Sequence, residues 1–216
     1  MTPGDPPPEI PPPGWPIHPQ RIPDDPQPVI VPSVPAHAVV WPDDPVVQLR
    51  ADRRLLLTGI LDQETADRLC AELMLADGRS ADPIELIINS PGGAVDAVPA
   101  VLDVIGLLRA PLTTRCIGAA GGTAAIVLAS GTAGRSATPR ATISLRLDGS
   151  YAIDGRGDDV RRAAAHVEQL WQRMAEHVAE VSAMTVDEAA SALRDGSPLS
   201  ATRARIIGLI DSIARH

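Results

Sequence analysis

The sequence predicts an α/β domain in which strands and helices alternate. Four β-rich runs alternate with helical patterns from residue 53 onward, and a long helical pattern follows the last of them. Such alternation is typical of mainly parallel pairing, because each helix carries the chain back over the sheet. The runs lie near 53–58, 84–89, 112–117 and 142–147, and the helices near 62–76, 93–108, 121–131 and 157–182.

The first 45 residues differ from the rest and predict an acidic, proline-rich leader. They contain 16 of the 22 prolines, six acidic residues and one Arg, which is a charge of −5 out of the total of −8. A segment with so few backbone donors and so little apolar surface is expected to be extended or disordered. The folded domain should then occupy residues 46–216. A docking arm for a proline-binding partner is the alternative, but no repeated PxxP register is evident.

Two strands end in runs of small residues. Residues 85–90 are β-rich and end in Ser90-Pro91-Gly92-Gly93, which predicts a glycine turn that opens the next helix. The strand at 112–117 runs into a second small-residue turn, 118–122, and then into a helix whose small side chains permit close packing. Strand–glycine–helix turns leave backbone N–H groups pointing outward, and such groups can hold an oxyanion.

The remaining elements predict an aliphatic core and one amphipathic helix. In the strand at 142–147, Ser144 alternates with apolar Ile143 and Leu145. With no Phe, one Tyr and three Trp in the chain, the core must be built from Leu, Ile, Val and Ala. In the long helix, apolar residues recur at three- and four-residue intervals. They are Val160, Ala164, Val167, Leu170, Trp171, Met174, Val178 and Val181.

Composition argues against several classes of function. All 19 basic residues are Arg and form no basic face, so nucleic acid is not an expected partner. Cys70 and Cys116 lie in apolar elements, which indicates free thiols in a reducing, cytoplasmic compartment. No signal peptide or membrane-spanning run is apparent, so no membrane is expected. His166 and His177 lack Cys, Asp or Glu at metal-ligand spacing and are expected on the helix surface, so no metal or cofactor is predicted.

The runs ELIINSPGGAVDA and CIGAAGGTAAIVLASG resemble the proteolytic subunit of the Clp protease family. That family has a strand–SPGG turn and then, at this separation, a strand–GxAAS–helix turn that carries a serine nucleophile. The likeness continues co-linearly over about 53–213 and includes the closing segments 184–195 and 199–211. It implies a crotonase-like spiral of repeated strand–helix units, with 157–182 as the family's long handle helix. The apolar pattern of 157–182 fits equally well a helix that covers its own domain's sheet.

The family's catalytic triad is changed at two of three positions. Gly122 lies 29 positions after Gly93 and falls in the nucleophile slot. Alignment on Pro139 puts Arg146 in the histidine slot, whereas an ungapped count from Gly122 puts Leu147 there. Glycine supplies no nucleophile, arginine stays protonated, and leucine has no ionisable group. Only Asp195 keeps its type, and it serves equally well as a turn or ion-pair carboxylate.

The resemblance also implies an oxyanion hole made by backbone amides. Its candidates are the N–H groups of Gly92 or Gly93 and of Thr123, converging near Gly122. Because one residue along a helix turns a side chain by about 100°, the Thr123 hydroxyl is expected to point away from the substrate.

These features predict a catalytically inactive structural or regulatory subunit of a ring-shaped ATP-dependent protease. The resemblance implies homo-oligomers or hetero-oligomers with active paralogues, in heptameric rings that can meet a Clp-type ATPase, with Leu170 and Trp171 near the contact. One alternative is an active ATP-dependent serine endopeptidase with a non-standard site. Another is a crotonase-like acyl-CoA-binding protein, since that fold also pairs two N–H groups around an oxyanion. The SPGG turn and the closing segment favour the Clp branch.

Overall fold

A computed structural model describes residues 44–147 and 157–214. The predicted leader lies almost wholly outside the described residues and stays a prediction. One compact unit spans Pro42–His216. Its first described element is a short helix, α1 (Pro45–Ala51), which the sequence analysis did not anticipate. Pro45 opens it, and Asp44 caps it by accepting the Val46 N–H at 2.9 Å.

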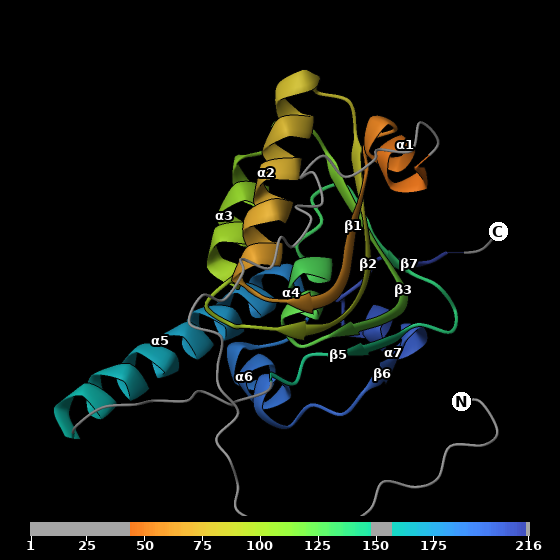
Figure 1. Ribbon diagram of the computed structural model, residues 1–216. Coiled ribbons are helices and arrows are strands. Elements are labelled where there is room, and N and C mark those ends of the chain that lie inside the picture. Colours follow the sequence, from red (N-terminus) through yellow and green to blue (C-terminus); the bar gives the residue numbers. More distant parts are fainter. Residues whose placement is uncertain (1–43, 148–156, 215–216) are drawn as a thin grey trace, which may run out of the picture. The chain divides into compact units, whose positions relative to one another are not determined.

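A mainly parallel sheet forms the body of this unit (Figure 1). Its strands follow the order β1-β2-β3-β4-β7, while β5 pairs with β3 and β6. Every described pairing is parallel except β5 with β6. The strands are β1 (Arg54–Leu61), β2 (Ile84–Gly93), β3 (Leu112–Gly121), β4 (Arg135–Ala137), β5 (Thr142–Ser144), β6 (Leu199–Ser200) and β7 (Ser212–Ile213).

Six further helices accompany the sheet in the part of the chain that the structure describes. Figure 1 shows α2 and α3 together on one face of the sheet, and α5 as a long rod whose beginning projects away from it. The short helix α4 packs on β2 and β3 and contacts α5. Their bounds are α2 (Gln63–Arg79), α3 (Val98–Leu107), α4 (Thr123–Ala129), α5 (Gly157–Val181), α6 (Val186–Asp195) and α7 (Ala201–Ile206).

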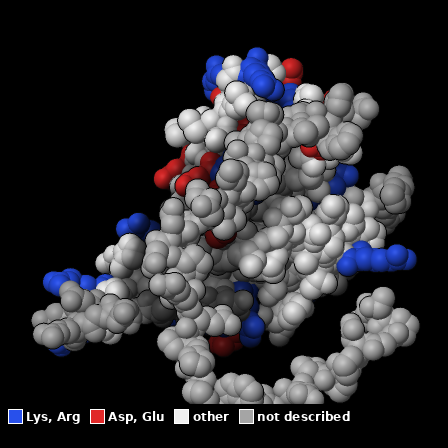
Figure 2. Space-filling view, viewed as in Figure 1, with Lys and Arg blue, Asp and Glu red and all other residues white. Residues whose placement is uncertain are grey.

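The core is aliphatic, as the composition predicted. Leu57, Leu61, Leu86 and Ile88 are at most 1% exposed, and all seven residues of α4 are buried. Each fully buried Leu or Ile contributes about 1.5–3 kcal/mol of hydrophobic free energy. The charged side chains visible in Figure 2 gather at the α1–α2 end and along α5, and mostly uncharged residues cover the region over the sheet.

The strand–helix alternation is confirmed, but the predicted glycine turn after β2 is wrong. Strand β2 continues through Ser90-Pro91 to Gly93, with Gly92 and Gly93 paired to the end of β1, and α3 begins only at Val98. Shifts of register at 58–60 and 88–90 let the chain bend without leaving the sheet. The glycines therefore lie in a paired strand end and not in a free turn.

Leu170 and Trp171, which we expected near a subunit contact, are largely covered by their own domain. Leu170 is 5% exposed and Trp171 is half-buried, because the C-terminal half of α5 packs on its own domain. On α5 itself Val160 is 36% exposed, and most of the other exposed large apolar side chains lie on other elements. On α2 and α3 they are Met74 at 62%, Leu75 at 57% and Leu107 at 80%.

One arginine joins the ends of three elements. The guanidinium of Arg135 pairs with Asp211, with 2.5 Å between Nη2 and Oδ1. It also donates to the carbonyl oxygens of Ala129, at the end of α4, and Val181, at the end of α5. The charge-assisted hydrogen bonds hold the pKa of Asp211 below its usual range. Arg135 thus fixes the C-terminal ends of both helices to the chain beside β7.

Candidate functional site

The two glycine-containing strand ends lie side by side in the sheet. Ser90 on β2 pairs with Ala120 on β3. A Cβ added at Gly92 would lie 2.3 Å from the carbonyl oxygen of Gly121, and one at Gly121 would lie 2.4 Å from that of Pro91. Neither position has room for a side chain, so the close approach of the two backbones requires glycine at both.

Gly122 holds a sharp turn from β3 into α4. It is the N-cap of α4, with φ +47° and ψ −116°, a backbone conformation that L side chains rarely adopt. Its N–H donates to the Ser144 carbonyl oxygen at 2.6 Å, which fixes the turn against β5. Nucleophile serines of hydrolases commonly lie on such strained strand-to-helix turns. The geometry of a nucleophile position is present here, without a side chain.

The structure identifies which side chain faces that position. A Cβ at Gly122 would lie 3.0 Å from the Arg146 carbonyl oxygen and 3.7 Å from Leu147 Cδ2. Leu147 is 4% exposed, and its N–H donates to the Leu193 carbonyl oxygen at 2.8 Å. Of the two candidates for the histidine slot, Leu147 is therefore the one whose side chain reaches Gly122, as the ungapped count gives. Arg146 is exposed.

Arg146 lies instead along a shallow groove of about 240 Å³ at the same strand ends. Its other lining residues are small or neutral, and no carboxylate lies among those described. They are Pro91, Ala119, Ala120, Gly121, Gly122, Thr142 and Ser144. The groove can receive an extended segment but offers no nucleophile next to a general base.

The predicted oxyanion amides come together, but two of them already have acceptors. The Gly92 N–H donates to Ser90 Oγ at 3.0 Å, and Ser90 Oγ donates to the Gly59 carbonyl oxygen at 2.6 Å. The Gly93 N–H donates to Thr123 Oγ1 at 2.8 Å. Thr123 is fully buried, at 0% exposure. The sequence did not indicate that Thr123 would accept this bond, because Gly93 and Thr123 lie 30 residues apart along the chain.

Asp195 is the last residue of α6 and is exposed. Among the described residues its carboxylate makes no hydrogen bond or ion pair, whereas neighbouring Arg194 pairs with Glu168 at 3.3 Å. The bond from Leu147 N–H to the Leu193 carbonyl brings the end of α6 beside the chain that follows β5. The end of α6 is thus near the right segment, but Leu147 fills the position where an imidazole would face Gly122.

His177 has a structural role that the sequence analysis missed, and its placement on the surface was wrong. It is half-buried, with Nε2 2.8 Å from Ser130 Oγ. Ser130 Oγ donates its proton to the Ile126 carbonyl at 2.7 Å, so the imidazole must be the donor to Ser130. Burial lowers the pKa of His177, and the nearby Glu180 only partly opposes this. The pair therefore joins α5 to the end of α4; His166 is exposed, as expected.

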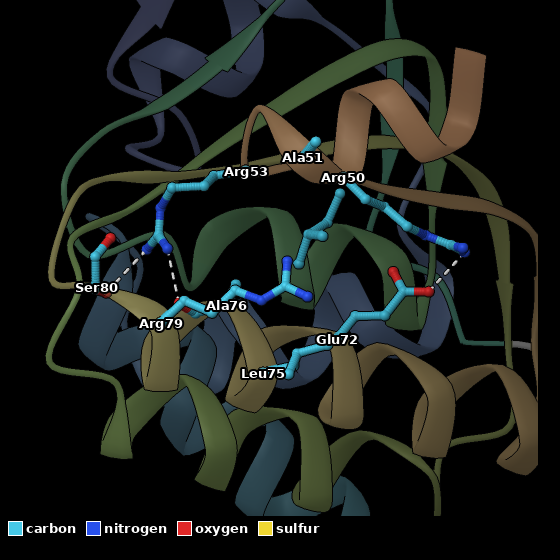
Figure 3. Close-up of a pocket in the computed structure, with 9 residues that line it drawn as sticks. Arg50, Ala51, Arg53, Glu72, Leu75, Ala76, Arg79 and Ser80 are labelled. Carbon is cyan, nitrogen blue, oxygen red and sulfur yellow. Dashed lines mark hydrogen bonds and ion pairs between the residues drawn. The ribbon is translucent and has the colours of Figure 1, made fainter. Parts of the chain in front are cut away.

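A second hollow, of about 230 Å³, lies between α1 and α2 (Figure 3). Its wall contains Arg53, whose guanidinium donates to the carbonyls of Ala76 at 2.7 Å and Ser80 at 3.3 Å. Across the hollow Arg50 pairs with Glu72 at 2.7 Å. Arg53 thereby serves as a C-terminal cap for α2, and this hollow is remote from the glycine turns.

No group of three His, Cys, Asp or Glu side chains in the described part of the chain is placed to hold a metal ion. No described helix is both long and apolar enough to span a bilayer.

The parallel spiral, the paired glycine strand ends and the turn at Gly122 define a protein of the crotonase-like fold with a serine-peptidase scaffold. A family model described as Clp protease matches residues 41–216. The chain belongs to the Clp protease family.

Individual relatives agree with this assignment. A Streptomyces coelicolor protein named "Putative ATP-dependent Clp protease proteolytic subunit-like" is 32% identical over 173 residues, which are 79% of this chain and 82% of that protein. An ATP-dependent Clp protease proteolytic subunit 1 of Tropheryma whipplei is 31% identical over 79% of this chain and 84% of its own length. The ClpP protease catalytic domain from Plasmodium falciparum has a TM-score of 0.71 at 22% identity, covering 83% of this chain and 95% of that one, and shares the fold.

Proposed function

We propose that this chain is a Clp proteolytic subunit that has lost peptidase chemistry and acts as a structural or regulatory subunit of a ring-shaped ATP-dependent protease. The observation that carries the proposal is the pair at the site. Where the chemistry needs a nucleophile and a base in contact, Gly122 faces Leu147, with 3.7 Å from the Cβ position to Cδ2.

The chemical argument follows from what each group must do. A serine peptidase needs an oxygen nucleophile, a neutral imidazole that takes its proton, and a carboxylate that orients the imidazole. Loss of the nucleophile alone lowers kcat by a factor of about 10⁶, and loss of the base adds little because the two act as a unit. Asp195 alone can supply neither function. The groove beside Gly122 can still receive an extended chain without cutting it.

The assembly part of the proposal is supported by surface chemistry and by the names of the relatives. Met74, Leu75 and Leu107 are between 57% and 80% exposed on α2 and α3, and large exposed apolar side chains mark interaction surfaces. The relatives are named as subunits of an ATP-dependent protease. We therefore assign to this chain a place in rings, heptameric as the family implies, made of itself or shared with an active paralogue and served by a Clp-type ATPase in the cytoplasm.

Two measurements test the proposal. The purified full chain should show no labelling by a fluorophosphonate probe and no hydrolysis of a short fluorogenic peptide, with an active Clp proteolytic subunit as the positive control. Labelling mapped to Thr123, Ser130 or Ser144 would overturn inactivity. Light scattering should detect a ring-sized oligomer, alone or with the active paralogue. A monodisperse monomer that ignores the paralogue would contradict the subunit role.

A further inference from the structure

We infer that the Thr123 side chain occupies the oxyanion hole of this site. In this arrangement Thr123 Oγ1 stands where the carbonyl oxygen of a bound substrate would accept a hydrogen bond from Gly93. The inference rests on the proposed function, because it adds the loss of the oxyanion hole to a site that already lacks its nucleophile and base. It concerns a different catalytic element from the other two, the electrostatic stabilisation of the oxyanion.

The geometry of the bond supports this assignment. The Gly93 N–H donates to Thr123 Oγ1 at 2.8 Å, which is an ordinary hydrogen-bond length. Gly93 is the last residue of β2, and Thr123 is the first residue of α4, directly after the turn at Gly122. An N–H that already donates to an internal acceptor cannot serve an incoming oxyanion unless that acceptor leaves. The Thr123 hydroxyl is therefore a built-in competitor of the substrate.

The competitor is held in place by packing. Thr123 is 0% exposed, and the six residues that follow it in α4 are buried as well. Because the side chain is enclosed by packed neighbours, rotation of the hydroxyl away from Gly93 would require those neighbours to move. Gly93 itself is exposed, and the bond from its N–H to Thr123 Oγ1 is partly buried. The bond occupies a donor that would otherwise be free near the turn at Gly122.

A purely structural role for the bond, fastening β2 to α4, makes different predictions. A structural bond affects stability alone, whereas occupation of the oxyanion hole affects the rate of a restored enzyme. Removing one oxyanion donor typically costs 10²–10³ in kcat, so freeing one should return a gain of about that size. The rate at which a restored site reacts with a covalent probe therefore distinguishes the two roles, because a merely structural bond would not change it.

The first experiment uses the double variant Gly122→Ser with Leu147→His as background. Thr123→Ala and Thr123→Ser are added to it separately; both delete the methyl group, and they differ only in the hydroxyl. Phosphonylation of the serine introduced by Gly122→Ser, in which a fluorophosphonate probe loses fluoride from phosphorus, should be about 100-fold faster with Ala than with Ser at position 123. Equal rates for the Ala and Ser variants, with measurable labelling of both, would overturn the inference.

The second experiment needs no restored activity and uses the otherwise unchanged chain. Hydrogen exchange of the Gly93 amide, measured by NMR, should be at least about tenfold faster in Thr123→Ala than in Thr123→Ser, because in the Ala variant this N–H loses its acceptor. The Gly92 amide, which donates to Ser90 Oγ, is the internal control and should not change. Equal exchange at Gly93 in the two variants would refute the inference even if no restored variant labels.

The two proposals fail in different ways. Peptidase activity of the unchanged chain would overturn the proposed function, while exchange at Gly93 would still decide whether Thr123 occupies the donor. Conversely, a double variant that labels equally fast with either residue at 123 would overturn this inference and leave the inactivity of the natural chain untouched.

Discussion

The turn at Gly122 gives the sharpest prediction for stability, the substitution Gly122→Ser. A serine there must adopt φ +47° and ψ −116°, and its Cβ would lie 3.0 Å from the Arg146 carbonyl oxygen. A side chain held in such a sparsely populated backbone region costs about 1–3 kcal/mol. The displaced carbonyl adds to this, for a total of about 2–4 kcal/mol. In a domain of this size the melting temperature should fall by about 4–15 °C.

Two glycines provide matched controls. Gly59 has φ +74° with no heavy atom within 4 Å of an added Cβ, so Gly59→Ser carries the backbone cost without the contact. It should lower the free energy of unfolding by about 1–2 kcal/mol. Gly78 lies in α2 with open space around it, so Gly78→Ser should be neutral or slightly stabilising. Thermal unfolding of the three variants, followed by circular dichroism, separates the cost of the positive-φ backbone from the cost of the contact with the Arg146 carbonyl.

The result that would refute this reasoning is a Gly122→Ser variant that melts within about 1 °C of the natural chain. It would mean that the turn is not held at positive φ, and that serine is absent from the slot for no steric reason. The expected result has a functional meaning. An active family member must bear this strain to present its nucleophile, whereas glycine relieves it once the chemistry is gone.

The other predictions concern the ends of the helices. Arg135→Met should lower the free energy of unfolding by about 2–3 kcal/mol in denaturant titrations, mainly because two partly buried helix-end carbonyls lose their donor while the half-exposed Asp211 can be solvated; a loss under about 1 kcal/mol would contradict the clamp. Because the pKa of Asp211 is lowered, its contribution is present above pH 3.8 and lost as the pH falls through the folded value, and Asp211→Asn should remove that dependence. The pKa of His177 is lowered by burial, so stability should be full above pH 6.5 and decline below it, and His177→Gln, which can still donate to Ser130, should flatten the decline. Arg53→Ala should cost about 2–3 kcal/mol by uncapping α2, measured by chemical denaturation, and an unchanged midpoint would refute the cap.

Much of the fold could be predicted from sequence because its main elements have strong local signals. The alternation of strand and helix patterns gave β1, β2, β3 and the helices between them, and the apolar repeat gave α5 within one residue at its end. Strands β4, β6 and β7 have two or three residues each, too few for any periodicity, and form only because long-range pairing completes the sheet. Glycines at 92 and 93 suggested a turn, but pairing with β1 outweighs their local preference.

At the site, sequence could name candidates but not choose between contacts. Whether Arg146 or Leu147 faces Gly122 depends on the bond from Gly122 N–H to the Ser144 carbonyl, which sets the register of β5. The bond from Gly93 to Thr123 joins residues far apart along the chain. For His177 a usable signal existed, since it follows Leu170 and Met174 by seven and three residues and so shares their apolar face.

The motif that identifies the family persists here for a reason that is independent of catalysis. Gly92 and Gly121 would each place a Cβ within 2.4 Å of the other strand's backbone, so the SPGG run and its partner are needed for the sheet to form at all. Gly122 and Leu147, by contrast, are not the residues that catalysis would require at their positions. Leu147 adds buried apolar area, whereas a histidine there would have to be desolvated. On the proposed function, this region keeps the glycines that the close strand contact requires and lacks the residues that only hydrolysis requires. Such a scaffold, with its fold kept and its catalytic residues absent, suits a subunit that must assemble but need not cut.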